Sequence, residues 1–358
     1  MKITLLISLL FSTITFAKSE PLPNWIDHNR ESIDKSATRA QPTTPPPTGS
    51  FRVPAEYEPI RAVVLGWEAY PEILNPIVKN VLADTNAEVW AMQGPSTYET
   101  NSRYHAVNCS LDSVWVRDYG PFGILENTDK NPSSAIVDTV YRHWQYRKND
   151  DAAPRCLGKT ENVPVFSIPL ILDGGNFLVD SQGNFFTTKR TYMWNKDKSE
   201  AEVNRLLKAY YNVKNIHVVD YAGYPGEPSD GTGHIDMFVK LLSDDTVLIG
   251  QAEQEPFKAT AEKAVAYFNS IKAPNGNPYK IIRVKNWYDG RTWYTYTNSL
   301  IVNNVVLMPA YRGKDAENNA AAKAYESGMP GVKVRMIYSD NSIVAGGSIH
   351  CVTQTIPE

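Results

Sequence analysis

The chain is poor in cysteine and carries no surplus of either charge. Its 358 residues include 3 cysteines, and 36 lysines and arginines nearly balance 39 aspartates and glutamates. This balance argues against the basic surface that nucleic-acid binding requires, so we expect no nucleic-acid partner. No apolar run after the first 17 residues is long enough to span a membrane. Hydrophobic residues still make up 42% of the chain, enough for a sizeable core.

The N-terminal segments differ in character from the rest of the chain. Lys2 precedes an apolar run, and small residues lie before a cleavage position after Ala17. This pattern predicts a signal peptide over residues 1–17, and therefore a secreted or periplasmic protein, with an uncleaved anchor as the alternative. Residues 18–50 are polar and become rich in proline and threonine, which predicts a disordered linker. We expect one catalytic domain over residues 51–358.

An odd number of cysteines leaves one thiol over in an exported chain. Cys109 and Cys156 are candidates for a disulfide, although the sequence is equally consistent with three unpaired thiols. Cys351 lies in the segment Gly-Gly-Ser-Ile-His-Cys near the C-terminus. The two glycines allow the backbone to come close to a ligand, so we interpret Cys351 as a candidate nucleophile.

A supersecondary unit recurs along the chain with a period of about sixty residues. Each unit has a polar anchor residue, a β-branched strand, a tight turn and a second strand, and helical patterns lie between the units. The anchors are Asp118, Asn176, Asp236, Asn298 and Cys351. Helices are expected over residues 199–211, 258–272 and 315–327.

The early strand predicted over residues 61–67 has no partner in its own unit. We expect it to pair with the last unit and to close a ring of five strand–helix units. Such a ring is an α/β fold, and it brings all five anchors to one central mouth. This convergence predicts a single active site built from residues that are far apart in the sequence.

Four of the converging side chains carry chemistry: Cys351, His234, Asp118 and Asp236. A histidine beside a thiol supplies a base for a nucleophile, and paired carboxylates suit a guanidinium group. In an extended segment His234 and Asp236 share one face, and the neighbouring His350 points away from Cys351, so His234 is the better base. The alternatives are a histidine that only satisfies local hydrogen bonds, and an Asp118 that braces a turn with Arg117.

Three further residues have weaker signals. Trp115 is expected to form a flat wall for a planar cation. Asn298 is expected in the site, with a strand-end amide as its structural alternative. Asp173, in an Asp-Gly-Gly-Asn segment, is interpreted as a turn residue at least as readily as a site residue.

Five motifs, in order and over residues 51–357, resemble the family of agmatine deiminases and Porphyromonas-type peptidylarginine deiminases. They are Trp-x-Arg-Asp-x-Gly-Pro at 115–121, Asp-Gly-Gly-Asn at 173–176, Gly-His-x-Asp at 233–236, Tyr-Thr-Asn-Ser at 296–299 and Gly-Gly-x-Ile-His-Cys at 346–351. The resemblance implies the pentein fold of guanidine-modifying enzymes, a pseudo-fivefold α/β-propeller.

The resemblance also implies a role for each site residue. Cys351 attacks the guanidinium carbon and forms a covalent thiouronium intermediate. His234 protonates the departing ammonia and then activates water, while Asp118 and Asp236 clamp the guanidinium nitrogens. Asn298 is an active-site amide and Trp115 a substrate wall. The resemblance implies neither a metal nor an organic cofactor, and the sequence has no convincing calcium-loop pattern.

The expected partner is an arginine-containing peptide or protein, because export favours such a substrate over a metabolite. Relatives that act on peptides bind the carboxylate of a C-terminal arginine with two arginines. Arg147 matches one of them, but the other falls on Gln145, so either Arg142 substitutes or internal arginines are accepted. Arg147 as a solvated surface charge is the alternative.

The sequence therefore predicts a secreted peptidylarginine deiminase that releases ammonia. Deimination of agmatine or free arginine is the alternative among enzymes. A secreted binding protein that keeps the fold without turnover is the alternative outside them, although the intact Cys351, His234 and aspartates argue against it. A cysteine protease has no obvious use for paired carboxylates.

Overall fold

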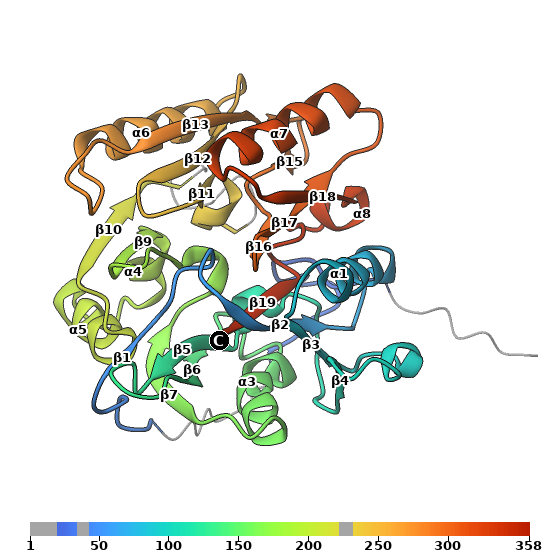
Figure 1. Ribbon diagram of the computed structural model, residues 1–358, viewed down its shortest axis with the longest axis vertical. Coiled ribbons are helices and arrows are strands. Elements are labelled where there is room, and N and C mark those ends of the chain that lie inside the picture. The colour runs from blue at the N-terminus through green and yellow to red at the C-terminus, as the bar shows by residue number, and fades with distance from the viewer. Residues whose placement is uncertain (1–19, 34–42, 222–231) are drawn as a thin grey trace, which may run out of the picture.

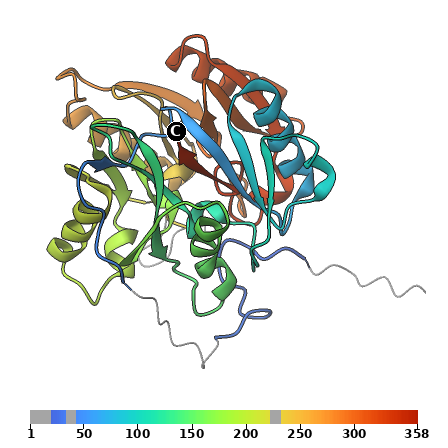
Figure 2. The ribbon, with the colours of Figure 1, turned by 60° about the horizontal axis from the view of Figure 1, so that its bottom comes forward.

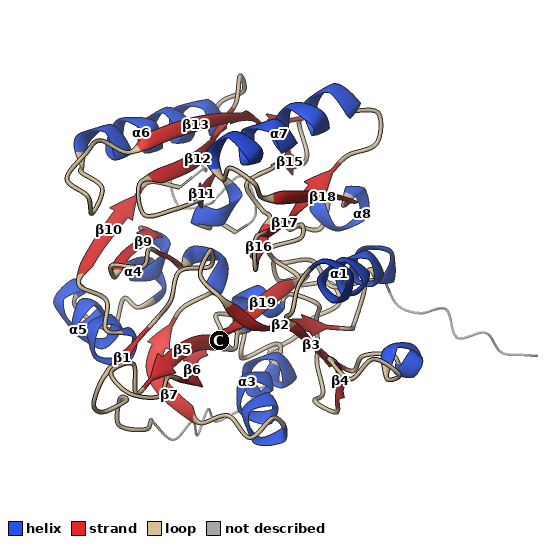
Figure 3. Cartoon of the chain, in the orientation of Figure 1, coloured by secondary structure: helices blue, strands red, loops and turns tan. Residues whose placement is uncertain are grey.

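The computed structural model describes residues 20–33, 43–221 and 232–358. In this part of the chain strands alternate with helices, so the α/β class is confirmed (Figures 1 and 3). Helices α5, α6 and α7 lie along the outer edge of the molecule, and strand β19 lies near the centre of the view (Figure 1). None of the described helices has the length and apolar character that a membrane span requires.

Five sheets of three or four strands share one plan in the described part of the chain. Each contains an antiparallel pair, and a helical crossover leads from its second strand to a parallel third strand. The five units, or blades, are arranged as a ring. This is the predicted pseudo-fivefold plan.

The first blade contains β19 (Thr353–Pro357), β2 (Ile60–Gly66), α1 (Pro71–Asp84), β3 (Glu88–Met92) and β4 (Tyr104–Val107). The second contains β1 (Phe51–Arg52), α2 (Val116–Tyr119), β5 (Phe122–Glu126), β6 (Ser133–Val140), α3 (Lys148–Thr160) and β7 (Val165–Ile171). The third contains β8 (Leu178–Val179), β9 (Asn184–Thr188), α4 (Arg190–Trp194), α5 (Glu200–Tyr211) and β10 (Asn215–Val219).

The fourth blade contains β11 (Val239–Leu241), β12 (Thr246–Gln251), α6 (Phe257–Ser270) and β13 (Lys280–Lys285). The fifth contains β16 (Leu300–Val302), β17 (Val305–Ala310), α7 (Asp315–Gly328), β18 (Lys333–Tyr338) and α8 (Asp340–Ile343). A small hairpin, β14 (Trp287–Tyr288) and β15 (Trp293–Tyr294), connects these two blades. Single 3₁₀ turns cover Ser96–Tyr98, Gly174–Asn176 and Ile235–Met237.

The ring closes between the two ends of the domain. Strand β19 pairs antiparallel with β2, so that Thr353 lies opposite Leu65. This pairing confirms the prediction that the early strand finds its partner in the last unit. Strand β2 also pairs in parallel with β3, as the second strand pairs with the third in every other blade.

The three predicted helices are also confirmed. Helix α5 is capped by the Ser199 hydroxyl, which accepts the N–H of Glu202 at 3.2 Å. Its apolar face packs into the core of the blade, because apolar residues recur at helical spacing. The buried residues of this face are Val203, Leu206, Leu207, Tyr210 and Tyr211.

Short turns, rather than extended segments, carry the anchors. His234 is the residue before the 3₁₀ turn Ile235–Met237, and Asp236 lies inside this turn. The expectation that His234 and Asp236 share one face of an extended segment is therefore wrong. Helix α2 and the turn Gly174–Asn176 hold the same position before the first strands of their blades. A tight turn places several side chains at the end of a strand, which an extended chain cannot do.

Residues 20–33 form an ordered segment that packs on the domain, so the predicted linker over 18–50 needs correction (Figure 2). The Asn24 N–H donates to the Ala345 carbonyl at 2.8 Å, and Asn24 is fully buried. Further along, the Thr44 N–H donates to the Ser167 carbonyl at 3.1 Å. The polar composition predicted disorder, because composition carries no information on the backbone hydrogen bonds that this segment makes with the domain. The linker prediction for 34–42, and the signal peptide, lie outside the described residues.

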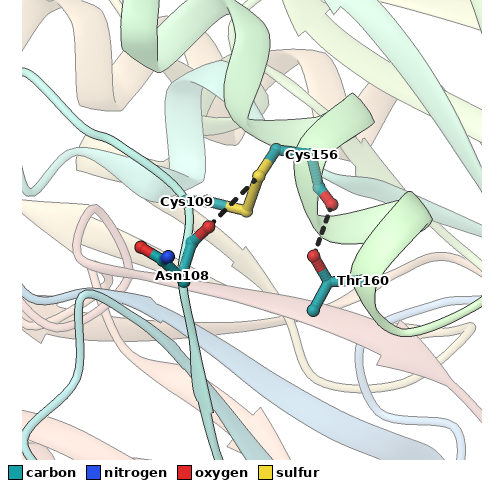
Figure 4. Close-up of a disulfide and its surroundings, with 4 residues drawn as sticks. All are labelled: Asn108, Cys109, Cys156 and Thr160. Atoms are coloured by element: carbon teal, nitrogen blue, oxygen red, sulfur yellow. Dashed lines mark hydrogen bonds between the residues drawn. A yellow bond between two sulfur atoms is a disulfide. The ribbon is translucent and has the colours of Figure 1, made fainter.

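A disulfide joins two neighbouring blades. Cys109, just after β4, is bonded to Cys156 on α3, with their Cα atoms 5.9 Å apart (Figure 4). Of the two alternatives from sequence, the structure has the paired one. Cys351 is left as the free cysteine.

Candidate active site

The thiol of Cys351 lies in the turn that precedes β19 and is fully buried. Its closest polar partner is Asn298, whose Nδ2 donates to Sγ at 3.2 Å. The Asn298 Oδ1 accepts the N–H groups of Ser348 at 3.0 Å and of Cys351 at 3.3 Å. Asn298 therefore fixes both the backbone and the sulfur of the nucleophile, and the structure brings together these two predicted site residues.

Gly347 lets the Trp115 ring approach the thiol. A Cβ atom at this position would lie 2.6 Å from the Trp115 ring and 2.8 Å from the Cys351 sulfur, so no larger residue fits there. The Trp115 ring thus forms one side of the thiol's surroundings. This is the location expected for a flat wall.

Two aspartates from different blades each present an unpaired oxygen. Asp118 Oδ1 accepts the Gly175 N–H at 3.1 Å, and Asp236 Oδ2 accepts Asn298 Nδ2 at 3.0 Å. Both residues are fully buried, yet Asp118 Oδ2 and Asp236 Oδ1 have no hydrogen-bond partner among the described residues. Buried carboxylate oxygens are normally hydrogen-bonded. A ligand with several N–H donors and a positive charge would satisfy both.

His234 lies between two carboxylates. Its Nδ1 is 3.4 Å from Asp118 Oδ1, and its Nε2 is 3.3 Å from Asp173 Oδ2. Burial opposes the charged imidazole, but the carboxylates of Asp118 and Asp173 outweigh burial and raise the pKa of His234. The two carboxylates therefore favour the imidazolium, the form of the ring that can donate a proton.

Asp173 was not among the predicted site residues. Its motif, Asp-Gly-Gly-Asn, reads as a turn, and the anchor chosen in this blade was Asn176. Asn176 instead has a structural role, because its side-chain oxygen accepts the N–H groups of Thr188 and Ile235 at 3.0 and 3.2 Å. The signal that would identify Asp173 is its place just before the first strand of its blade, as for Asp118.

The carboxylates of Asp236 and Asp118 act on the Cys351 thiol. Burial, Asp236 and Asp118 together raise the pKa of Cys351 well above its usual range. Burial, Asp173 and Asp236 also raise the pKa of Asp118, although His234 and Arg142 oppose this shift. A cation placed between the carboxylates would lower both pKa values, so the ligand itself promotes formation of the thiolate.

His350 supports Asp236 and is not positioned as the base of the thiol. Its Nδ1 is 2.6 Å from Asp236 Oδ2, and its Nε2 is 2.7 Å from Glu56 Oε2. Glu56 also binds Lys240 and lies 3.4 Å from Arg117. Burial opposes ionisation of Glu56, but Lys240, His350 and Arg117 outweigh it and hold the pKa of Glu56 well below its usual value. Sequence reasoning missed Glu56, because it lies outside the repeat.

The two arginines predicted to bind a substrate carboxylate already have partners in the chain. Arg142 Nε lies 2.8 Å from Asp173 Oδ2. Arg147 binds Glu31 through two contacts, Nε to Oε1 at 2.7 Å and Nη2 to Oε2 at 2.9 Å. The alternative of a solvated surface charge is wrong for Arg147, because its side chain is 0% exposed.

Asp118, Asp173 and His234 also have the composition of a metal site, since their ligand atoms lie within 4.8 Å of one another. A metal ion binds a neutral imidazole. The two carboxylates instead favour the protonated ring, so this cluster fits a proton carrier better than a metal centre.

Solved structures of proteins named as deiminases share this architecture. An agmatine deiminase of Enterococcus faecalis, described as catalysing its reaction, covers 88% of this chain and all of its own, with a TM-score of 0.75 at 22% identity. The structure of a protein from Porphyromonas gingivalis that is named a putative arginine deiminase has a TM-score of 0.74 at 22% identity and covers 86% of this chain and 99% of its own. These similarities show the fold, which is the pentein fold of guanidine-modifying enzymes.

The sequence narrows the class to one family. Residues 52–357 match the family of Porphyromonas-type peptidyl-arginine deiminases, and the chain belongs to this family of guanidino-group deiminases. Among similar proteins, an agmatine deiminase of Pseudomonas aeruginosa is 24% identical over 89% of this chain and 98% of its own length. The predicted resemblance and fold are thereby confirmed.

Proposed function

We propose that the protein hydrolyses the guanidinium group of agmatine to a ureido group and releases ammonia. One observation carries this proposal: a buried thiol is flanked by two buried aspartates, and each aspartate has one oxygen without a partner among the described residues. A guanidinium carries five N–H donors in a plane and keeps its charge at ordinary pH. It satisfies both oxygens and supplies a positive charge.

The chemistry runs in two balanced halves. The bound cation lowers the pKa of Cys351, whose proton passes to solvent, and the thiolate adds to the guanidinium carbon. The imidazolium of His234 gives its proton to one nitrogen, the C–N bond breaks, and ammonia leaves a thiouronium on Cys351. Water then adds to the same carbon, giving one proton to neutral His234 and one to solvent, and the C–S bond breaks to release the ureido product.

The surroundings of the two arginines favour agmatine over peptidyl-arginine, which reverses the order expected from the sequence. Glu31 compensates the charge of Arg147, and Asp173 that of Arg142. The carboxylate of an arginine peptide would therefore find no uncompensated cation to bind. The amine of agmatine would likewise meet no uncompensated cation that repels it. Relatives named as agmatine deiminases point to the same substrate. Peptidyl-arginine is the second candidate, because both arginines are present and the chain is expected to be exported.

We also propose that the protein is exported, with a signal peptide removed after Ala17. The disulfide between Cys109 and Cys156 supports this proposal, since disulfides persist in oxidising compartments. N-terminal sequencing of protein from the culture medium or periplasm tests it. An intact N-terminus in the cytoplasm would contradict it.

The test of function measures ammonia and ureido product with agmatine, free arginine and peptides that carry internal or C-terminal arginine. We expect the highest kcat/KM with agmatine and no turnover by Cys351→Ser. A preference for any arginine peptide over agmatine would reject the proposed substrate. Failure with every guanidine would reject the enzyme itself.

A further inference from the structure

Residues 20–33, the ordered N-terminal segment, form an N-terminal strap on the domain. One of its contacts is with the residue beside the nucleophile. Trp115 Nε1 donates to the Leu22 carbonyl at 2.9 Å, and the same ring faces Gly347 and the Cys351 sulfur. The strap is therefore one side chain away from the thiol.

The strap also contacts the histidine side of the site. Arg142 Nη2 donates to the Asn24 carbonyl at 2.9 Å and to its side-chain oxygen at 3.1 Å. The same guanidinium pairs with Asp173, which lies 3.3 Å from His234. Leu22 is thus connected to the Cys351 thiol through Trp115. Asn24 is connected to the Asp173–His234 pair through Arg142.

The deepest contact of the strap is with Arg147. Glu31 binds this guanidinium with both carboxylate oxygens, and the carbonyls of Pro23 and Trp25 each accept from Nη2 at 2.8 Å. A carboxylate held by two parallel contacts to arginine is the arrangement that a substrate carboxylate would use. Here the chain supplies both the carboxylate and the peptide carbonyls itself.

We propose that the strap is a specificity element, which occupies the positions that the backbone and terminal carboxylate of an arginine peptide would take. This inference rests on the proposed deiminase function and adds what sets its substrate range. With the strap in place, the site accepts agmatine, a linear molecule with no carboxylate and no peptide backbone. Displacement of the strap exposes Arg142 and Arg147 and admits arginine at a peptide C-terminus.

Two variants loosen the strap in different ways. Glu31→Gln removes the charge that Arg147 binds while keeping the shape of the side chain. Trp25→Ala removes a ring that is 40% exposed and uncovers no buried charge. This ring packs against Gly346, where an added Cβ would lie 3.0 Å from it. Asn29→Ala, at an exposed position in the same strap, is the matched control.

The measurement is kcat and KM for agmatine and for a short peptide that ends in arginine. The wild type and Asn29→Ala should prefer agmatine to the same degree. In Glu31→Gln and Trp25→Ala we expect kcat/KM for the peptide to rise by about tenfold or more, mainly through KM, since a larger fraction of molecules is open. The kcat/KM for agmatine should stay within about threefold of the wild type.

An unchanged ratio of peptide to agmatine activity in both variants would overturn the proposed role of the strap. So would a parallel loss of both activities, which would mean that the strap completes the site for every guanidine. The proposed function fails separately, if the wild type deiminates neither compound. A gain of activity on the peptide in only one of the two variants would still support the proposal.

Discussion

At the scale of single residues, carboxylates from two blades favour the protonated form of the His234 imidazole. Asp118 comes from α2, and Asp173 from the residue before the turn Gly174–Asn176. Together they raise the pKa of the ring although it is fully buried, and burial alone would lower it. Asn298 has the complementary task and holds the sulfur of Cys351 together with Asp236. Acid and nucleophile are therefore positioned by different partners and can be perturbed separately.

We predict that Asp173→Asn shifts the pH dependence of deimination. Protonation of the departing nitrogen requires the imidazolium, so activity falls as pH rises through the folded pKa of His234. Asp173 contributes to the raised pKa, and its removal moves this falling limb to lower pH. On this falling limb kcat should drop by about tenfold for each pH unit by which the limb moves.

Asp180→Asn is the matched control, because Asp180 is a buried aspartate in the same blade that binds Asn184 instead of His234. Its pH profile should follow the wild type. An unmoved falling limb in Asp173→Asn would show that Asp173 does not tune His234.

At the scale of elements, the site depends on the short turns that start each blade. Helix α2 carries Asp118 and the 3₁₀ turn Ile235–Met237 carries Asp236, which leaves the strands to form the core. Regular sheet alone would place alternate residues on opposite faces. The disulfide acts at the same scale, since it joins the end of β4 to α3 of the next blade.

We predict that the paired Cys109→Ser and Cys156→Ser substitutions lower the free energy of unfolding. The two residues are 47 positions apart, and a loop of that length corresponds to about 4 kcal/mol in the chain-entropy model. Denaturant unfolding of the variant and the wild type measures the difference. The activity of the folded variant on agmatine should persist, because neither cysteine touches the site. An equal midpoint and slope for both proteins would contradict the prediction.

At the scale of the whole molecule, a ring of five similar blades converts distant sequence positions into one site. Cys351 precedes β19, which pairs with β2 from the other end of the domain. The nucleophile is therefore placed by the closure of the ring. Asp118, His234 and Asn298 come from three further blades, so no single blade contains the chemistry.

The spacing of the anchors was sufficient to predict this ring, because each blade repeats one hairpin and one helix. Helix α5 followed from its cap and its apolar face. The prediction of an extended segment at His234 and Asp236 was wrong, because the spacing of motifs along a sequence does not distinguish the end of a strand from a turn. Asp173 and Glu56 were missed, since their roles depend on contacts between blades.

The strap was also beyond the reach of sequence reasoning. Residues 20–33 lack the apolar pattern of a core element, and their order comes from hydrogen bonds to Arg142, Arg147 and Ala345. Such contacts leave no periodic signal. Arg142 and Arg147 were predicted to bind a substrate carboxylate, and in the structure their partners are the carboxylates of Asp173 and Glu31.

The central claim is that Cys351 forms a covalent bond to the guanidinium carbon while His234 supplies and removes protons. The most direct measurement is the intact mass of the wild type, quenched in acid during incubation with agmatine, with His234→Ala as a variant in which loss of ammonia, and therefore the adduct, should form more slowly. We expect an added mass on Cys351 that matches the thiouronium of agmatine without ammonia, located by peptide mapping and absent from Cys351→Ser. Ureido product formed by Cys351→Ser at the wild-type rate, or an adduct on another residue, would contradict the account.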